Sequence, residues 1–234
     1  YANVLRYKDD YYNRFFVIKK AKKNLSEIEY ERFKREFEEM KKLNSPYVIE
    51  VYHFDDEKRQ YIMEYADNTL DSYILKNNGS MEVKERIGLV RQIFRAFIYI
   101  NSKGVLHRDV STKNILIKKY EGLNVIKVSD FGLVKLEDSI LTNKNTAIKG
   151  YFNDPKLEIT GFDNYSILHE TYALTRVVYF VMTGKIKMDS YKNPDFKKFI
   201  EKGIGEESGR YKNIEELQDA FNKIVHTFSW KYFY

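Results

Sequence analysis

The sequence contains no cysteine, only three prolines and no long apolar run among its 234 residues. Without cysteine, a disulfide framework and a thiolate metal site are excluded, which favours a cytoplasmic protein. The four histidines do not cluster, so a zinc site is not expected. No stretch approaches the roughly 20 apolar residues of a membrane span, and the chain opens without a signal-peptide pattern. We therefore expect no membrane span in this chain and no disulfide-stabilised fold.

The formal net charge is +6, and a basic balance of this kind can attract nucleic acid or anionic lipid. The lysines alternate with acidic residues, however, as in KKAKKNLSEIEYERFKREFEEMKK. Such alternation is typical of solvated helix faces. Because no basic stripe with interleaved aromatic residues matches a nucleic-acid-binding module, no nucleic-acid partner is expected.

The pattern along the chain changes from strand-like to helical near Ala66. Alternating, β-branched and aromatic segments predict strands at residues 2–8, 14–21, 47–54, 59–66, 114–118 and 124–129. Helical periodicity predicts helices at residues 26–43, 81–102, 167–184 and 213–225. Ser26 is a suitable N-cap for the first helix, and Gly184 suits the end of the third. We therefore expect an α+β fold with two lobes, residues 1–65 and 66–234, and a ligand site between them.

Four segments carry ionisable residues in apolar surroundings: Lys19 in FVIKKA, Glu36 in the first helix, His107-Arg108-Asp109 followed by Asn114, and Asp130-Phe131-Gly132. Taken singly, each has a simple structural explanation. Lys19 could lie on an edge strand, Glu36 could be a surface glutamate, and Asp130 could belong to a turn in which glycine supplies a positive φ.

Taken together and in this order, the four segments resemble the motifs of the protein kinase family. That family has a strand lysine, a helix glutamate, H-R-D-x-x-x-x-N and D-F-G. The segment YIMEYA, residues 61–66, resembles its hinge strand. The resemblance runs from about Val4 to the last predicted helix. It implies a bilobal kinase fold, with a small β-rich N-lobe and a larger helical C-lobe.

The resemblance also implies the cofactors ATP and Mg²⁺ and a protein substrate with a hydroxyl acceptor. Lys19 would hold the α- and β-phosphates and pair with Glu36. Asp130 and Asn114 would ligate Mg²⁺, which prefers hard oxygen ligands. Asp109 would accept the proton of the substrate hydroxyl and orient it for in-line attack.

Other matches concern the adenine ring and the packing around the site. Glu64 and Ala66, after the gatekeeper Met63, would offer backbone groups to adenine. The family's positions that enclose the ring are Val4, Val17 and Leu116. A stack of side chains linking the lobes would consist of Met40, Val51, His107 and Phe131, which makes His107 a packing residue rather than an acid or base. Glu170, in place of an aspartate, would brace the backbone of the catalytic loop.

The sequence departs from the family at two places. The glycine-rich phosphate loop is not visible, because Ala2 stands where its last glycine would be; the loop lies upstream of this chain or is lacking. The A-P-E motif becomes Asp154-Pro155-Lys156. We expect Lys156 to repel the motif's usual arginine partner, here Arg210, with Glu158 as a candidate replacement for the lost carboxylate.

The next residues concern which hydroxyl accepts the phosphate and how phosphorylation regulates the kinase. Ser111 replaces a lysine of many serine/threonine kinases, and Lys113 could reach the γ-phosphate as a second catalytic residue. A basic residue at Lys113 resembles tyrosine kinases, whereas H-R-D-V-S-x-x-N resembles some plant receptor-type serine/threonine kinases. We expect a serine/threonine kinase. Arg108 would meet a phosphorylated residue, for which the candidates for autophosphorylation are Ser139, Thr142 and Thr146.

Two alternatives remain open from the sequence. The unseen glycine-rich loop and the altered A-P-E motif suggest a pseudokinase that serves as an ATP-binding scaffold. A small-molecule kinase would share the Asp…Asn…Asp pattern but usually lacks complete H-R-D and D-F-G motifs.

Overall fold

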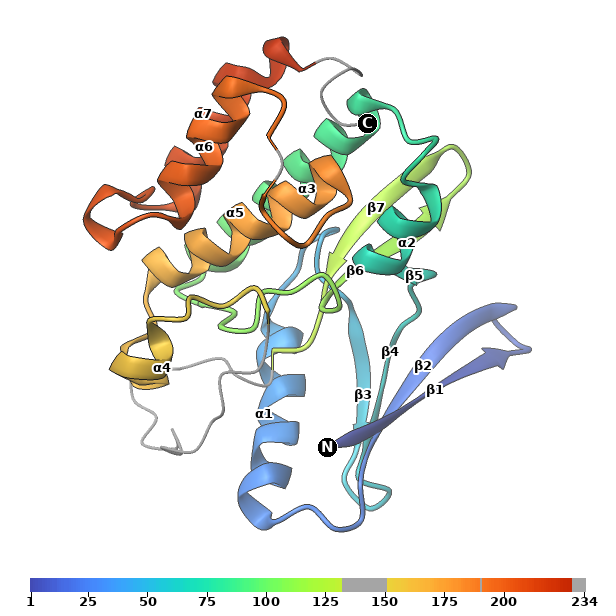
Figure 1. Ribbon diagram of the computed structural model, residues 1–234. Helices are drawn as coiled ribbons and strands as arrows, with labels where there is room; N and C mark the ends of the chain where they lie inside the picture. The colour runs from blue at the N-terminus through green and yellow to red at the C-terminus, as the bar shows by residue number, and fades with distance from the viewer. Residues whose placement is uncertain (132–150, 190, 229–234) are drawn as a thin grey trace.

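The computed structural model describes residues 1–131, 151–189 and 191–228. A β-sheet with one helix forms a smaller part, and a mostly helical remainder forms a larger part (Figure 1). The elements before Ala66 belong to the smaller part. The α+β architecture expected from the sequence is therefore confirmed, while the placement of the lobe boundary between residues 65 and 66 stays a prediction. Among the described residues, no helix is both long and apolar enough to cross a membrane.

Four antiparallel strands form the first sheet in the order β1-β2-β4-β3. Their bounds are β1 Ala2–Asp9, β2 Arg14–Ala21, β3 Val51–Asp55 and β4 Gln60–Glu64. All four strands were predicted, but β3 begins four residues later than its apolar pattern indicates. The reason is that the backbone of residues 47–49 pairs with Val128 in the larger part instead. This segment therefore joins the two parts of the molecule.

The strand register decides which side chains share a face of this sheet. Val4 lies opposite Lys19, and Val17 lies opposite Met63. Directly opposed residues point to the same face, as do residues two apart along a strand. Val4, Val17, Lys19 and Met63 therefore lie on one face, as the kinase resemblance requires.

Helix α1, Glu27–Lys42, begins and ends where the sequence predicts. Ser26 caps it and forms a capping box with Glu29, which satisfies two backbone donors at the helix start. Its buried face carries Phe33, Glu36 and Met40. Phe33 packs against Tyr61 of β4 with ring centroids 5.1 Å apart, so the helix is fixed against the sheet beside Lys19.

The larger part contains a second sheet and a helical core. Its sheet has the order β5-β6-β7, with β5 Asn68–Thr69, β6 Ile115–Tyr120 and β7 Leu123–Val128. The α-helices are α2 Leu70–Asn77, α3 Val83–Ser102, α4 Leu157–Thr160, α5 Ile167–Thr183, α6 Pro194–Ile204 and α7 Ile214–Ile224. Single 3₁₀ turns lie at Phe162–Asn164, Glu207–Gly209 and Val225–Thr227.

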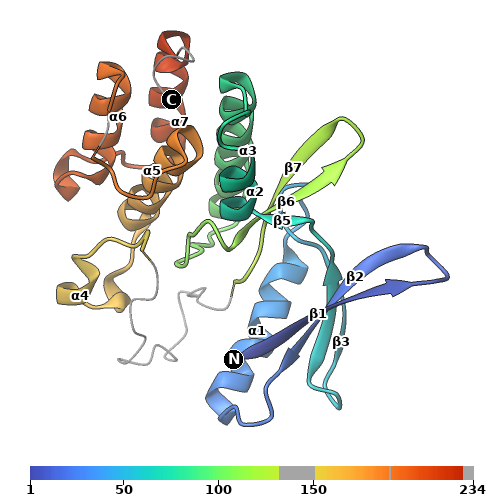
Figure 2. The ribbon, with the colours of Figure 1, turned by 45° about the vertical axis from the view of Figure 1, so that its right-hand side comes forward.

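Helix α5 is the centre of the larger part. Most of its side chains are buried, and α3, α6 and α7 all contact it. Figure 2 shows these helices grouped on the side of the molecule opposite to β1 and β2. Gly184 ends α5 with a left-handed φ of 69°, as predicted. The sequence-based prediction missed α2, α6 and the short α4 and β5, although Pro194 after Asn193 is a typical helix start.

Candidate functional site

The ammonium group of Lys19 is buried between two carboxylates. Its Nζ lies 2.5 Å from Glu36 Oε1 and 3.7 Å from Asp130 Oδ2. Burial by itself would lower the pKa of Lys19, but the two carboxylates outweigh burial and hold this pKa above its ordinary value. Tyr61 donates a hydrogen bond of 2.6 Å to Glu36 Oε1, and Tyr1 donates one of 3.4 Å to Oε2. The direction of the Lys19 side chain is thus fixed by Glu36 and Asp130, and Glu36 is held in turn by Tyr61 and Tyr1.

The structure excludes the simple explanations of these two residues. Strand β2 lies between β1 and β4, so Lys19 is not on an edge strand. Glu36 is 1% exposed, so it is not a surface glutamate. A buried ion pair must recover a large desolvation cost through close contact and further hydrogen bonds, and both are present here.

The segment around Asp109 is attached to the buried helix α5. Glu170 accepts hydrogen bonds from the backbone N–H groups of His107, at 2.9 Å, and Arg108, at 3.2 Å. The Tyr165 hydroxyl donates to the same carboxylate at 2.9 Å. The prediction that Glu170 braces the catalytic loop is confirmed, and its longer side chain still reaches two consecutive amides.

His107 is a packing residue with both ring nitrogens engaged. Its Nδ1 accepts from the Asp109 N–H at 3.3 Å, so in the neutral ring Nε2 carries the proton and donates to the Ser129 carbonyl at 2.9 Å. The ring is fully buried, 4.8 Å from that of Phe131. Burial and these two hydrogen bonds confirm the prediction that His107 is a packing residue. Met40, Val51 and Phe131, its expected partners, are buried in one core cluster.

Asn114 links the two acidic segments. Its Nδ2 donates to both the carbonyl oxygen and the carboxylate of Asp109, each at 2.9 Å. Its own carbonyl oxygen accepts from the Ser129 N–H at 2.9 Å, immediately before Asp130. Its amide oxygen Oδ1 has no partner in the part of the chain that the structure describes. A free amide oxygen and the half-exposed Asp130 carboxylate are hard donors of the type that Mg²⁺ prefers.

Two residues of the site have left-handed backbones. Arg108 has a φ of 66° and Asp130 a φ of 65°, and neither is a glycine. Such conformations cost of order 1 kcal/mol or more and cluster at functional sites. At Arg108, the hydrogen bonds that Glu170 accepts from this residue and from His107 offset the strain.

The side chain of Glu64 has a role that the sequence did not reveal. Its carboxylate lies 2.5 Å from Lys118 Nζ and 2.9 Å from Lys127 Nζ, so it joins β4 to β6 and β7. Burial would raise the pKa of Glu64, but hydrogen bonds and charge from the two lysines lower it below its ordinary value. The Glu64 N–H donates to the carbonyl of Glu50, so this backbone donor is already bonded within the protein.

The remaining predicted site residues differ in exposure. Val17 is buried, Met63, Ala66 and Leu116 are half-buried, and Val4 and Lys113 are exposed. Lys113 forms no ion pair with any residue that the structure describes. Its catalytic role therefore stays a prediction, as do the adenine contacts of the others.

Arg108 lies against Phe162 at the other side of this loop. Its guanidinium stacks over the Phe162 ring at 4.3 Å and donates to the Phe162 carbonyl at 2.6 Å. Burial lowers the pKa of this guanidinium. The phosphorylated partners expected for Arg108 are Ser139, Thr142 and Thr146, and all three lie outside the described residues.

The predicted repulsion between Lys156 and Arg210 is wrong. Arg210 Nη1 lies 2.5 Å from Asp154 Oδ2, and both side chains are fully buried. Lys156 points to solvent and pairs with Glu206. Glu158 is exposed and is not the replacement. The first residue of the altered motif therefore supplies the carboxylate that its last residue has lost.

Beside this pair, Asp154, His169 and Glu207 place their ligand atoms within 4.8 Å of one another. The Ser166 N–H donates to His169 Nδ1 at 3.0 Å, so the proton of the neutral ring is on Nε2, which faces the carboxylates. A metal would need the lone pair that this proton occupies. Burial lowers the pKa of His169, which favours this neutral form. The three residues are therefore explained as a structural cluster.

Comparison with known proteins agrees with this geometry. The family model described as the protein kinase domain matches residues 1–228. The chain belongs to the protein kinase family. A protein of Clostridium perfringens named "Probable serine/threonine-protein kinase CPE1738" is 31% identical over 91% of this chain and 31% of its own length. The serine/threonine-protein kinase PrkC of Bacillus subtilis is 30% identical over 68% of this chain and 24% of its own length.

The chain is thus a protein kinase domain that spans less than a third of the length of these curated relatives, and ATP binding is implied by the family. A solved structure, that of the Rad53 kinase domain and SCD2, matches with a TM-score of 0.72 at 20% identity. That match covers 97% of this chain and 86% of the other. At this identity the match shows the fold, which is that of a kinase domain.

The Asp154–Arg210 pair yields a stability prediction. Replacing Asp154 with Ala leaves the buried Arg210 charge unpaired, so the free energy of unfolding should fall by about 3–5 kcal/mol. Lys156→Ala is the matched control, because it removes only a solvent-exposed ion pair and should leave this free energy nearly unchanged. Urea denaturation followed by circular dichroism measures both. Equal effects of the two substitutions would contradict the assignment.

The Glu64 carboxylate yields a pH prediction. A carboxyl whose pKa is lowered by folding stabilises the protein above its ordinary pKa of about 4.3, and this contribution is lost as pH falls through the lowered value. Glu64→Gln should therefore be less stable than the wild type by about 2 kcal/mol at pH 7, with a difference that shrinks below about pH 4. Other carboxyls titrate alike in both proteins. A difference that is constant with pH would exclude a charged Glu64.

Proposed function

We propose that this domain transfers the γ-phosphate of ATP to a serine or threonine hydroxyl of a protein substrate, with Mg²⁺ as the cofactor. The observation that carries the proposal is the continuous set of contacts from Glu36 through Lys19 to Asp130, and from Ser129 through Asn114 to Asp109. It connects one cation with the oxygen donors that phosphoryl transfer requires. A cytoplasmic location, where ATP and Mg²⁺ are supplied, is part of the proposal.

Each residue has a defined part in this reaction. Lys19, held by Glu36, would bind the α- and β-phosphates. Asp130 and the Asn114 amide oxygen would hold Mg²⁺, whose charge neutralises the phosphate oxygens. The Asp109 carboxylate, oriented by the Asn114 amide, would accept the proton of the attacking hydroxyl. Because phosphoryl transfer depends on positioning and charge more than on covalent chemistry, the hydrogen bonds that fix Asp109 contribute directly to the rate.

Two observations favour serine or threonine and retention of activity. The curated relatives named above are serine/threonine-protein kinases. The altered A-P-E motif, one of the two reasons to consider a pseudokinase, retains a buried carboxylate–arginine pair through Asp154. Ser139, Thr142 and Thr146 remain the candidate sites of autophosphorylation. Arg108 would bind the phosphate group.

Incubation with γ-labelled ATP and Mg²⁺, followed by identification of the labelled amino acids, tests the proposal. The wild type should yield phosphoserine or phosphothreonine. Asp109→Asn should lower the rate by about 10²–10⁴-fold because it removes the proton acceptor. Asp130→Asn should also lower it through loss of a metal ligand. Asp219→Asn, an exposed position on α7, is the matched control and should keep the wild-type rate.

Three outcomes would contradict the proposal in different ways. No labelling by the wild type would favour an ATP-binding scaffold without catalysis. Equal labelling in Asp109→Asn and the wild type would exclude the proposed site. Phosphotyrosine as the main product would exclude the serine/threonine assignment.

A further inference from the structure

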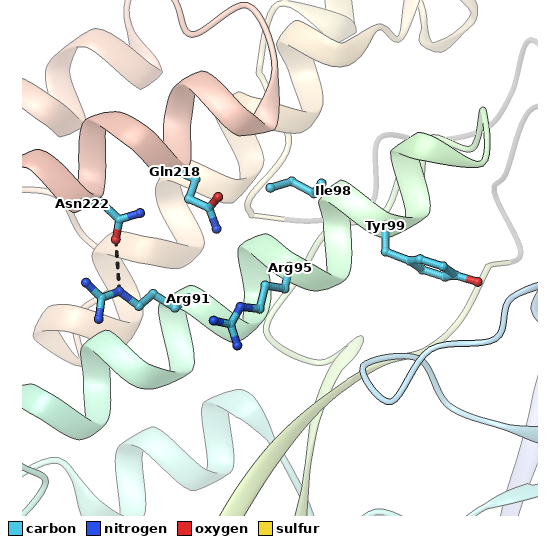
Figure 3. Close-up of a pocket in the computed structure, with 6 residues that line it drawn as sticks. All are labelled: Arg91, Arg95, Ile98, Tyr99, Gln218 and Asn222. Atoms are coloured by element: carbon cyan, nitrogen blue, oxygen red, sulfur yellow. Dashed lines mark hydrogen bonds between the residues drawn. The ribbon is translucent and has the colours of Figure 1, made fainter.

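A groove on the larger part of the molecule lies outside the phosphoryl-transfer site. It is open to solvent, runs between α3 and α7 and has a volume of about 600 Å³. Its lining residues are Arg91, Arg95, Ile98, Tyr99, Gln218 and Asn222 (Figure 3). None of the predicted catalytic or nucleotide-binding residues contributes to it. The groove is therefore a separate feature of the surface.

The polar side chains of the groove come from facing helices. Arg91 and Arg95 are one turn apart on α3, and Gln218 and Asn222 are one turn apart on α7. Figure 3 shows Arg91, Gln218 and Asn222 directed into the space between the two helices. Arg91 Nε donates to Asn222 Oδ1 at 3.0 Å, which fixes the guanidinium at the edge of the groove.

The two arginines carry charge that the described protein does not neutralise. Both are exposed, and neither forms an ion pair with a residue that the structure describes. Arg95 Nη1 contacts the hydroxyl of Tyr47 at 3.5 Å. Like charges one turn apart on a helix destabilise it slightly. Lys103, at the C-cap of the same helix, adds a further basic side chain, with its Nζ 5.5 Å from the Tyr99 ring.

We propose that this groove binds an acidic, extended peptide segment of a protein partner through two carboxylates at alternate positions. Side chains four residues apart on a helix are separated by about 6 Å along its axis. Side chains two residues apart on an extended chain are separated by about 6.7 Å on one face. The backbone spacings match, so one carboxylate can meet each arginine once the Arg95 side chain turns from Tyr47 toward the groove. A guanidinium binds a carboxylate with paired N–H donors.

Gln218 and Asn222 complete the site on the opposite wall. An extended peptide exposes backbone N–H and C=O groups between its side chains, and each amide side chain offers a donor and an acceptor for them. Tyr99 and Ile98 provide an apolar surface at the end of the groove. This binding needs neither ATP nor Mg²⁺, so it does not rest on the proposed function.

Fluorescence anisotropy tests the inference directly. The probe is a labelled short peptide with Glu at two alternate positions, compared with the same peptide carrying Gln at both. The wild-type protein should bind the Glu peptide, and the binding should weaken as NaCl is raised. The double variant Arg91→Gln/Arg95→Gln should lose at least about tenfold in affinity. Arg14→Gln, an exposed arginine of β2, is the matched control and should bind as the wild type does.

The controls separate this inference from failed folding and from the kinase activity. Thermal unfolding of the double variant should match the wild type, since both arginines are exposed. Asp109→Asn should retain full peptide binding even where labelling is lost. Equal binding of the Glu and Gln peptides, no binding to the wild type, or unchanged binding by the double variant would overturn the inference. Preference for a phosphoserine peptide over the Glu peptide would overturn the carboxylate assignment in favour of a phosphorylated partner.

Discussion

The buried ammonium group of Lys19 is the constraint on which the rest of the structure depends. Burial disfavours its charge, and two carboxylates from elements far apart in the sequence offset this cost. Glu36 reaches it because α1 packs on the sheet through Phe33 and Tyr61, and Asp130 reaches it from the end of β7 in the larger part. One ion-pair network thereby fixes the sheet, the helix and the second lobe relative to one another.

A second buried carboxylate performs the corresponding task in the larger part. Glu170 lies on the central helix α5 and accepts from two consecutive amides of the loop that carries Asp109. Because α5 packs against several helices, its position in the core also fixes the loop that carries Asp109. The site thus combines two charged anchors, one in each lobe, and Asn114 and Ser129 connect them through hydrogen bonds. Strain at Arg108 and Asp130 is accommodated within this rigid frame.

The sequence predicts those parts of the fold that depend on local pattern or on an ordered motif. Alternation gave the four strands of the first sheet, capping gave the start of α1 at Ser26, and the motif order gave the kinase family. Prediction from the sequence fails where tertiary structure decides which residues come into contact. The Asp154–Arg210 pair, the Glu64 side chain between two lysines and the late start of β3 each depend on chain segments that no spacing in the sequence brings together.

Titration of the protein with ATP by calorimetry, with and without Mg²⁺, tests the central claim most directly. If the Lys19 network and the Asn114–Asp130 oxygens form one nucleotide–metal site, the wild type should bind ATP more tightly with Mg²⁺ than without it. Lys19→Met should weaken binding in both conditions, whereas Asp130→Asn should abolish the gain from Mg²⁺. Equal affinity with and without Mg²⁺ in the wild type, or unchanged binding in Lys19→Met, would contradict the account.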